Sequence, residues 1–230
     1  MKNLNTEEWF PIVDEQGNTI GKALRTVCHD GKSKLLHPVV HLHLFNSSGE
    51  LFLQKRAMTK DILPGKWDTS VGGHLCPGET VEEALAREVK EELCIKNINA
   101  GFLARYIWES PLERELVNTF STTTDETPLI NRDEIEEGKF WSIQGIKDKI
   151  GKDIFTPNFE HEFKMLISYT INLTEKRIFV LEKNVNQSYQ NEARQNLFIT
   201  FNTDNTHNHF LDYLLHSCCQ YCEFPGDLFR

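Results

Sequence analysis

The sequence predicts an α/β (α+β) sandwich built on a mixed β-sheet, and three observations support this prediction. Short segments rich in β-branched and aromatic residues occur in pairs, separated by turn residues. One longer segment, residues 80–93, contains no Gly or Pro and places its apolar residues at helical spacing. Paired strands interleaved with a few helices are typical of helices that pack on a sheet.

Each element is predicted from its own residues. Residues 9–13 and 19–24 are extended segments that flank a turn-rich stretch, which indicates a hairpin. Residues 39–45 and 51–54 form a second pair around a five-residue connection that contains Gly49. The remaining expected elements are a loop at 57–67, strands at 100–108, 115–122 and 139–142, and helices at 143–150 and 158–169.

The composition changes at about residue 170, where Asn becomes frequent and no helical or strand period is clear. We therefore expect a domain over residues 1–169, with a β-hairpin at its N-terminal end, and a C-terminal appendage over 170–230. Weak patterns suggest a strand at 198–201 and a helix at 210–215. The appendage is expected to cover the domain, to form a homodimer contact or to be partly disordered.

Charge and hydropathy exclude several classes of partner. The chain has 230 residues and a formal net charge of −9, and it lacks the basic run that marks a nucleic-acid arm. No stretch approaches the roughly 18 consecutive apolar residues of a membrane span. The first residues lack an apolar signal core, so we expect a cytoplasmic protein with six free thiols, no membrane and no nucleic-acid partner.

Three glutamates lie close together on the helix predicted at 80–93. Glu88, Glu91 and Glu92 stand at positions i, i+3 and i+4 and therefore project from one helical face. Unpaired like charges at this spacing repel by a few tenths of a kcal/mol per pair, about 0.2–0.5. A hard divalent cation would turn this repulsion into coordination by oxygen ligands. The other interpretation of the three glutamates alone is a solvated acidic face.

The residues around these glutamates form a longer pattern, Gly73-x5-Glu79-x7-Arg87-Glu88-Val89-x-Glu91-Glu92-Leu93-x-Ile95. This pattern resembles the Nudix box at every fixed position except Cys94, where the family has Gly. The resemblance implies a Nudix-like α/β/α sandwich with a mixed β-sheet. Non-Gly residues in a left-handed helix cap cost about 1 kcal/mol, so we expect a local loss of stability at Cys94.

The resemblance also implies roles for the residues of the box. Glu88, Glu91 and Glu92 would bind Mg²⁺ or Mn²⁺, with the backbone carbonyl near Gly73 as a further ligand. Arg87 and Glu79 would hold the carboxylates in place. The implied substrate is a small-molecule diphosphate.

A second pattern resembles the isopentenyl diphosphate isomerase branch of the Nudix superfamily, from about Glu7 to Tyr169. It comprises Leu36-His37-Pro38, Gly49, Lys55-Arg56, Lys60, Pro64-Gly65-x-Trp67, Gly73-His74, Gly78-Glu79 and Glu113-x-Glu115. The resemblance implies a possible second divalent metal held by His29, His37, His74, Glu113 and Glu115. It also implies that Arg25, Arg56 and Lys60 bind the diphosphate, since cations neutralise phosphate oxygens. Taken singly, each of these histidines is more often a partly exposed or hydrogen-bonded sheet residue than a metal ligand.

Two departures argue against isomerase chemistry. Gly72 occupies the position of the isomerase's acid/base cysteine, and Glu88 replaces a phosphate-binding Arg of that branch. We therefore predict a metal-dependent hydrolase that cleaves a diphosphate linkage in a nucleoside diphosphate derivative or a related organic diphosphate. Isopentenyl diphosphate isomerase and a non-catalytic nucleotide-binding module are the alternatives.

Two further features are left open by the sequence. A general base is expected among Glu134, Glu136 and Glu137, in a loop, without a choice among them. Trp9, Phe10, Trp67 and Trp108 are expected to pack in the core rather than to stack on a base.

Overall fold

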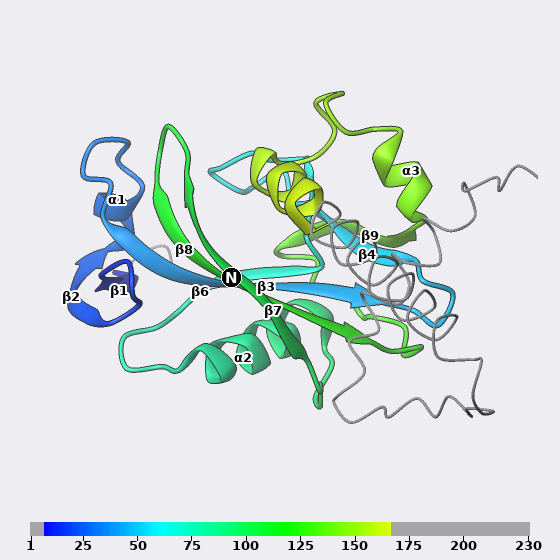
Figure 1. Ribbon diagram of the computed structural model, residues 1–230, viewed down its shortest axis with the longest axis horizontal. Coiled ribbons are helices and arrows are strands. Elements are labelled where there is room, and N and C mark those ends of the chain that lie inside the picture. The colour runs from blue at the N-terminus through cyan, green and yellow to red at the C-terminus, as the bar shows by residue number, and fades with distance from the viewer. Residues whose placement is uncertain (1–6, 167–230) are drawn as a thin grey trace, which may run out of the picture. The chain divides into compact units, whose positions relative to one another are not determined.

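The computed structural model describes residues 7–166 (Figure 1). Contacts between residues group residues 1–160 into one compact unit and residues 161–230 into a second. The predicted appendage from residue 170, with its strand at 198–201 and helix at 210–215, lies outside the described residues. In the part that is described, no helix has the length and hydrophobicity needed to cross a membrane.

The centre of the fold is a seven-stranded mixed sheet. The strands follow the order β5-β4-β3-β8-β7, while β6 pairs with β3 and β9 pairs with β4. The long strands β3 and β8 are parallel over ten residue pairs, from Leu36 and Arg114 to Phe45 and Thr123. The strand bounds are β3 (Leu36–Phe45), β4 (Leu51–Arg56), β5 (Trp67–Asp68), β6 (Val71–His74), β7 (Gly101–Glu109), β8 (Arg114–Thr123) and β9 (Ile135–Trp141).

Along one edge, β3 pairs with two different strands, β6 and β4. Residues 39–42 of β3 pair with β6, whereas only Leu44 and Phe45 pair with β4. The predicted hairpin between the strands at 39–45 and 51–54 is therefore correct, but its strands separate after two residue pairs. Because β4 and β6 diverge from the same edge, side chains from a neighbouring helix can reach the backbone between them.

Helix α2 (Val81–Leu93) lies along one face of this sheet, opposite the face covered by α3 (Ile143–Lys147) (Figure 1). The Thr80 side chain caps its first turn and forms a capping box with Glu83, which satisfies backbone groups that a helix start leaves unpaired. Its apolar stripe of Ala84, Leu85, Val89 and Leu93 packs on Val40, Leu42 and Leu44 of β3. Burial of each large apolar side chain contributes about 1.5–3 kcal/mol.

The helix ends at Cys94 in the left-handed conformation, with φ 58° and ψ 16°. Cys94 therefore adopts the backbone geometry that Gly would supply at this position, although a Cβ makes it unfavourable. We expect Cys94→Gly to raise the free energy of unfolding by about 0.5–1 kcal/mol, because relief of this strain exceeds the added chain entropy. Urea unfolding of the two proteins measures the difference; equal stability would show that Cys94 is unstrained.

A separate hairpin, β1 (Trp9–Val13) and β2 (Thr19–Leu24), leads into the short helix α1 (Arg25–Cys28) at the end of the sheet where β3 begins (Figure 1). Phe10, Ile12 and Cys28 form the hairpin's own apolar cluster. Burial confirms the prediction of core packing for Phe10 and for Trp67. The prediction of core packing is wrong for Trp9, because this residue is 37% exposed.

The structure contains elements that the sequence did not predict. Strands β5 and β6 and helix α1 lie in stretches expected to be irregular. β6 has the sequence Val-Gly-Gly-His, whose two glycines weaken any strand pattern, and it is a strand because β3 supplies its hydrogen bonds. Strand β9 begins four residues earlier than predicted, and α3 ends three residues before the predicted 150. Residues 157–166 are helical, as predicted for 158 onward.

Candidate active site and metal centre

Glu92 lies in the gap between β4 and β6. Its Oε2 accepts a hydrogen bond from Gln54 Nε2 at 2.9 Å and one from the backbone N of Gly72 at 3.3 Å. The residue is only 3% exposed. The divergence of β4 and β6 therefore admits a carboxylate from α2 into the sheet edge and fixes its orientation.

Glu88 lies one helical turn earlier and crosses directly over Gly73. A Cβ built at Gly73 would stand 2.0 Å from the Glu88 side-chain carboxyl carbon, so that no larger residue fits beneath it. Glycine at this position is thus required by a close approach, and not by its backbone angles. The backbone of β6 and the Glu88 carboxylate are consequently in contact.

Arg87 connects the loop before α2 with the carboxylates on the helix. Its Nε and Nη2 donate to the two oxygens of Glu79 at 2.7 and 2.8 Å, and its Nη1 donates to Glu88 Oε1 at 2.6 Å. Nη2 also donates to the carbonyl of His74 at 2.9 Å. Glu91 stands 3.7 Å from Nη1, with 46% of its side chain exposed. The structure therefore brings together the residues that the Nudix resemblance groups, with Glu91 on the solvent side.

Burial changes the acidity of the two inner carboxyls. It raises the pKa of Glu88 to about 7, against the opposing effect of Arg87, and the pKa of Glu92 to about 8. The negative charge of Glu134 raises both pKa values further, as does that of Glu88 for Glu92. Two buried carboxylates facing a third acidic residue favour the approach of a cation, which would replace the lost hydration.

A second group of polar residues gathers where β3 and β8 begin. We call His29, His37, His74, Glu113 and Glu115 the histidine–glutamate cluster. His29 follows α1, His37 lies near the start of β3, and His74 ends β6. The parallel register of β3 and β8 places His37 opposite Glu115.

The members of the histidine–glutamate cluster are close enough to share one ion. One ligand atom from each of His29, His37, His74 and Glu113 lies within 4.8 Å of all the others. The ring centroids of the three histidines are 5.2–5.5 Å apart. Glu115 Oε1 lies 4.0 Å from His74 Nε2, and His29 Nε2 lies 3.0 Å from Glu113 Oε2.

The imidazole nitrogens of this cluster fit a divalent metal. Nε2 of His29, His37 and His74 is buried in each case. Among the described residues, Nε2 of His37 has no hydrogen-bond partner, whereas that of His29 lies beside Glu113 and that of His74 lies near Glu115. His37 Nδ1 lies 2.9 Å from the carbonyl of Leu35, an arrangement that leaves the Nε2 lone pair free for a ligand bond. Burial lowers the pKa of His37 and places that of His74 well below its ordinary value, so both rings are neutral at pH 7.

Glu115 behaves as expected for a carboxyl that lacks a counter-ion. Burial, followed by the charge of Glu113, raises the pKa of Glu115 to about 8. Its Oε2 accepts a hydrogen bond from Asn158 at 3.2 Å. A cation within the cluster would offset the repulsion between the two glutamates.

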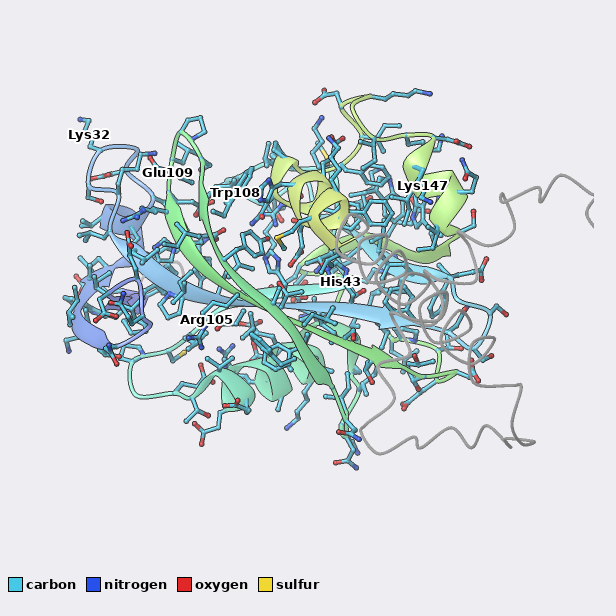
Figure 2. The ribbon with its side chains drawn as sticks, viewed as in Figure 1. Lys32, His43, Arg105, Trp108, Glu109 and Lys147 are labelled. Atoms are coloured by element: carbon cyan, nitrogen blue, oxygen red, sulfur yellow. The ribbon has the colours of Figure 1, made fainter. Side chains whose placement is uncertain are left out.

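Two neighbouring histidines stay outside this group. His41 pairs with Gly72 across β3 and β6, where a Cβ on Gly72 would lie 3.6 Å from the imidazole Cδ2. His43 lies further along β3, towards the middle of the molecule (Figure 2). The alternation of side chains along β3 thus separates His41 and His43 from the apolar face that packs on α2.

Each of the three predicted phosphate-binding residues forms an ion pair with an acidic residue. Arg25 pairs with Glu8 at 3.3 Å, Arg56 with Asp68 at 3.2 Å and Lys60 with Glu134 at 3.1 Å. Lys60 also lies close enough to Glu92 to act against the rise in that residue's pKa. A phosphate would therefore have to compete with these carboxylates for the same cations.

Of the three glutamates expected in a loop as candidate general bases, only Glu134 lies in one. Glu136 and Glu137 lie in β9 and are exposed. Glu134 precedes the strand, and its carbonyl accepts a hydrogen bond from Ala57 N at 3.1 Å. The strand begins early because Ile135 is fully buried and Arg56 pairs with it.

Sequence reasoning missed Gln54, which orients Glu92. Gln54 lies in a correctly predicted strand, but a single glutamine there gives no signal of its partner 38 residues later. It also missed the contact between Phe10 and the histidine–glutamate cluster, described below.

Comparisons with known proteins identify the family of this chain. The family model described as NUDIX domain matches residues 35–159, more than half of the chain. The chain is 33% identical over 133 residues to an uncharacterized Nudix hydrolase of Pseudomonas aeruginosa, covering 58% of this chain and 78% of that protein. It is 30% identical over 160 residues to isopentenyl-diphosphate Delta-isomerase 1 of Photorhabdus laumondii, covering 66% and 90%.

Solved structures support the fold. The crystal structure of DR0079 from Deinococcus radiodurans matches with a TM-score of 0.60 and 28% identity, covering 69% of this chain and 98% of that one. A MutT protein from Methanosarcina mazei matches with a TM-score of 0.50 and 23% identity, covering 56% and 91%, which supports the fold alone. The predicted Nudix-like sandwich with a mixed sheet is confirmed, and this chain belongs to the Nudix family.

Proposed function

We propose that this Nudix protein is a metal-dependent hydrolase that cleaves a diphosphate linkage in a nucleoside diphosphate derivative or a related organic diphosphate. The observation that carries the proposal is the position of Glu88 and Glu92. Both carboxyls are buried against β6, and Arg87 joins Glu88 to Glu79. Residues with a purely structural role would not need two buried, mutually repelling carboxyls at a sheet edge.

Mg²⁺ or Mn²⁺ would be held by Glu88, Glu91 and Glu92, with the backbone near Gly73. Bound there, the ion would supply charge neutralisation for the diphosphate oxygens and a more acidic water. Arg87 and Glu79 keep Glu88 in position, and Gln54 does the same for Glu92. Lys60 and Arg56 would exchange their present carboxylate partners for phosphate oxygens as the substrate binds.

Glu134 is our choice for the general base. Its charge acts on both Glu88 and Glu92, whereas Glu136 and Glu137 lie exposed in β9. It would accept a proton from the attacking water, with Lys60 beside it as a counter-charge.

We expect Glu134→Gln to lower kcat by about 10²-fold, because the amide cannot accept the proton. Mg²⁺ affinity, measured by calorimetry, should change little. Glu136→Gln, an exposed neighbour, is the matched control and should retain activity. Equal kcat for wild type and Glu134→Gln would refute this assignment.

The alternative function, isopentenyl diphosphate isomerase, is suggested by relatives of about 30% identity that are named as such isomerases. Gly72 argues against it, because it offers no side chain to protonate carbon. A non-catalytic nucleotide-binding module is disfavoured by the complete carboxylate set on α2.

The histidine–glutamate cluster is proposed as a second divalent metal site. Three buried Nε2 atoms beside two carboxylates support this proposal. Metal analysis tests it: His37→Ala and His74→Ala should each lose one bound transition-metal ion per chain. Glu88→Gln should keep that ion, because its carboxylate belongs to the other site.

A panel of nucleotide and prenyl diphosphates tests the function as a whole. With Mg²⁺, the full chain should release phosphate or a nucleoside monophosphate from one member, and EDTA should stop the release. Isotope exchange into the prenyl group of isopentenyl diphosphate without phosphate release would instead support the isomerase. Tight binding without turnover across the panel would support the binding module.

A further inference from the structure

Phe10 of the N-terminal hairpin packs directly against the histidine–glutamate cluster. Its ring centroid lies 4.1 Å from that of His74, and the two ring planes differ by only 3°. The same ring is 5.3 Å from His37, at 20°, and 5.7 Å from His29, at 48°. One aromatic side chain therefore contacts all three imidazoles.

The hairpin holds Phe10 firmly in this position. Phe10 is 1% exposed and pairs with Ala23 of β2. It shares an apolar cluster with Ile12 and Cys28, the residue just before His29. The hairpin thus presents a fixed, flat, apolar surface to the three imidazoles.

His74 needs such a surface more than His37 does. The last side-chain torsion of histidine is broad, so hydrogen bonds or packing must fix the ring plane. His37 is oriented through Nδ1 by the carbonyl of Leu35, at 2.9 Å. For His74, Nε2 has no hydrogen-bond partner within the described residues, and the Phe10 ring, parallel at 4.1 Å, is closer and better aligned than the stacked His37 ring at 5.3 Å and 19°.

We propose that Phe10 is a positioning residue for the ion of the histidine–glutamate cluster: it fixes the plane of His74 and closes the apolar side of the cluster to water. This inference rests on the proposed second metal site. Groups that orient a metal-binding histidine typically alter metal affinity by 10–100-fold, and the apolar surroundings of a site control access of solvent.

Co²⁺ titration of the full chain, followed by visible absorption in excess Mg²⁺, tests this proposal. Mg²⁺ prefers the all-oxygen carboxylate site, whereas Co²⁺ prefers imidazole, so the signal reports the histidine–glutamate cluster. We expect Phe10→Ala to weaken Co²⁺ binding about 10-fold or more and to shift the absorption bands. Phe10→Leu keeps an apolar side chain but removes the flat ring. It should weaken Co²⁺ binding and shift the absorption bands in the same direction, but by less than Phe10→Ala.

Ile12→Ala is the matched control, because Ile12 lies on the same strand and in the same apolar cluster. It should loosen the hairpin and leave Co²⁺ affinity and spectrum as in wild type. Wild-type binding by both Phe10 variants would overturn the proposal, and so would an equal loss in Ile12→Ala. If Phe10→Ala does not fold, Phe10→Leu decides.

The same titration distinguishes a failure of the proposed second metal site from a failure of the proposed role of Phe10. Absence of the imidazole-type spectrum from wild type, with no effect of His37→Ala, would reject the second metal site and this inference with it. A wild-type spectrum that His37→Ala abolishes and both Phe10 variants retain would reject the role of Phe10 alone.

Discussion

Gly73→Ala is expected to lower the metal-dependent turnover of the best diphosphate substrate by about 10³-fold. The new Cβ would stand 2.0 Å from the Glu88 carboxyl carbon, and ordinary contact needs at least 3.4 Å. Because Glu88 is buried and its side chain passes directly over Gly73, the carboxylate must leave its position over the strand. A displacement of about 1 Å at a catalytic site can cost about 10²-fold, and this displacement is larger.

Gly72→Ala is the matched control for Gly73→Ala. A Cβ on Gly72 would meet only His41 and Thr69, at 3.6 Å, which is ordinary contact. It should fold like wild type and lose far less activity than Gly73→Ala. Steady-state kinetics with a Mg²⁺ titration measures both variants. Similar losses in the two would mean that β6 tolerates no side chain at all, and that contact with Glu88 is not the reason for Gly73.

The metal-free protein is expected to lose stability as the pH rises from 5 to 8. Burial raises the pKa of Glu115 to about 8, which contributes to this loss, and Glu92 contributes as much. Its pKa is about 8 in the folded chain against an ordinary 4.5. Between these values the folded state binds the extra proton, so the free energy of unfolding falls as the pH rises. Glu88, with a pKa of about 7, acts in the same direction.

Glu92→Gln should remove the contribution of Glu92 and leave those of Glu88 and Glu115, because the amide resembles the protonated carboxyl. In EDTA at pH 8, the variant should be more stable than wild type by on the order of 3 kcal/mol, and the two should converge near pH 5. Urea unfolding across this range measures the difference, with exposed Glu82→Gln as the control. The histidines titrate in both proteins and cancel in the comparison. A constant difference between pH 5 and pH 8 would contradict the raised pKa of Glu92.

The parts of the fold that the sequence predicts well are those with local causes. Helix α2 is one example, because its apolar period and the Thr80 capping box lie within the helix itself. The resemblance to the Nudix box implied that Arg87 and Glu79 hold the carboxylates in place, and in the structure these two residues are hydrogen-bonded to each other. Cys94 was identified as a departure, and the structure shows how the chain accommodates it, by a left-handed residue with a Cβ.

The features that sequence reasoning missed depend on distant partners. Strand β6 exists because β3 pairs with it, and its glycines hid that pairing. The need for Gly at position 73 follows from the path of Glu88, which no local pattern reveals. Phe10 meets His74 across 64 positions of the chain, so a prediction of core packing was correct without showing what the ring packs against.

The phosphate-binding assignments show another limit. Arg56 and Lys60 were chosen because they are basic and match a family pattern. The structure gives each an acidic partner, Asp68 and Glu134, that the sequence could not indicate. Their role in binding substrate is therefore a proposal that involves an exchange of partners.

Hydrolysis by Glu92→Gln, compared with Glu82→Gln, tests the central claim most directly. Both variants change one glutamate of α2, but only Glu92 lies between β4 and β6. With Mg²⁺ and the substrate found in the panel, wild type and Glu82→Gln should release product at similar rates, and Glu92→Gln should release almost none. Turnover by Glu92→Gln equal to that of wild type would contradict the assignment of these carboxylates as the metal site.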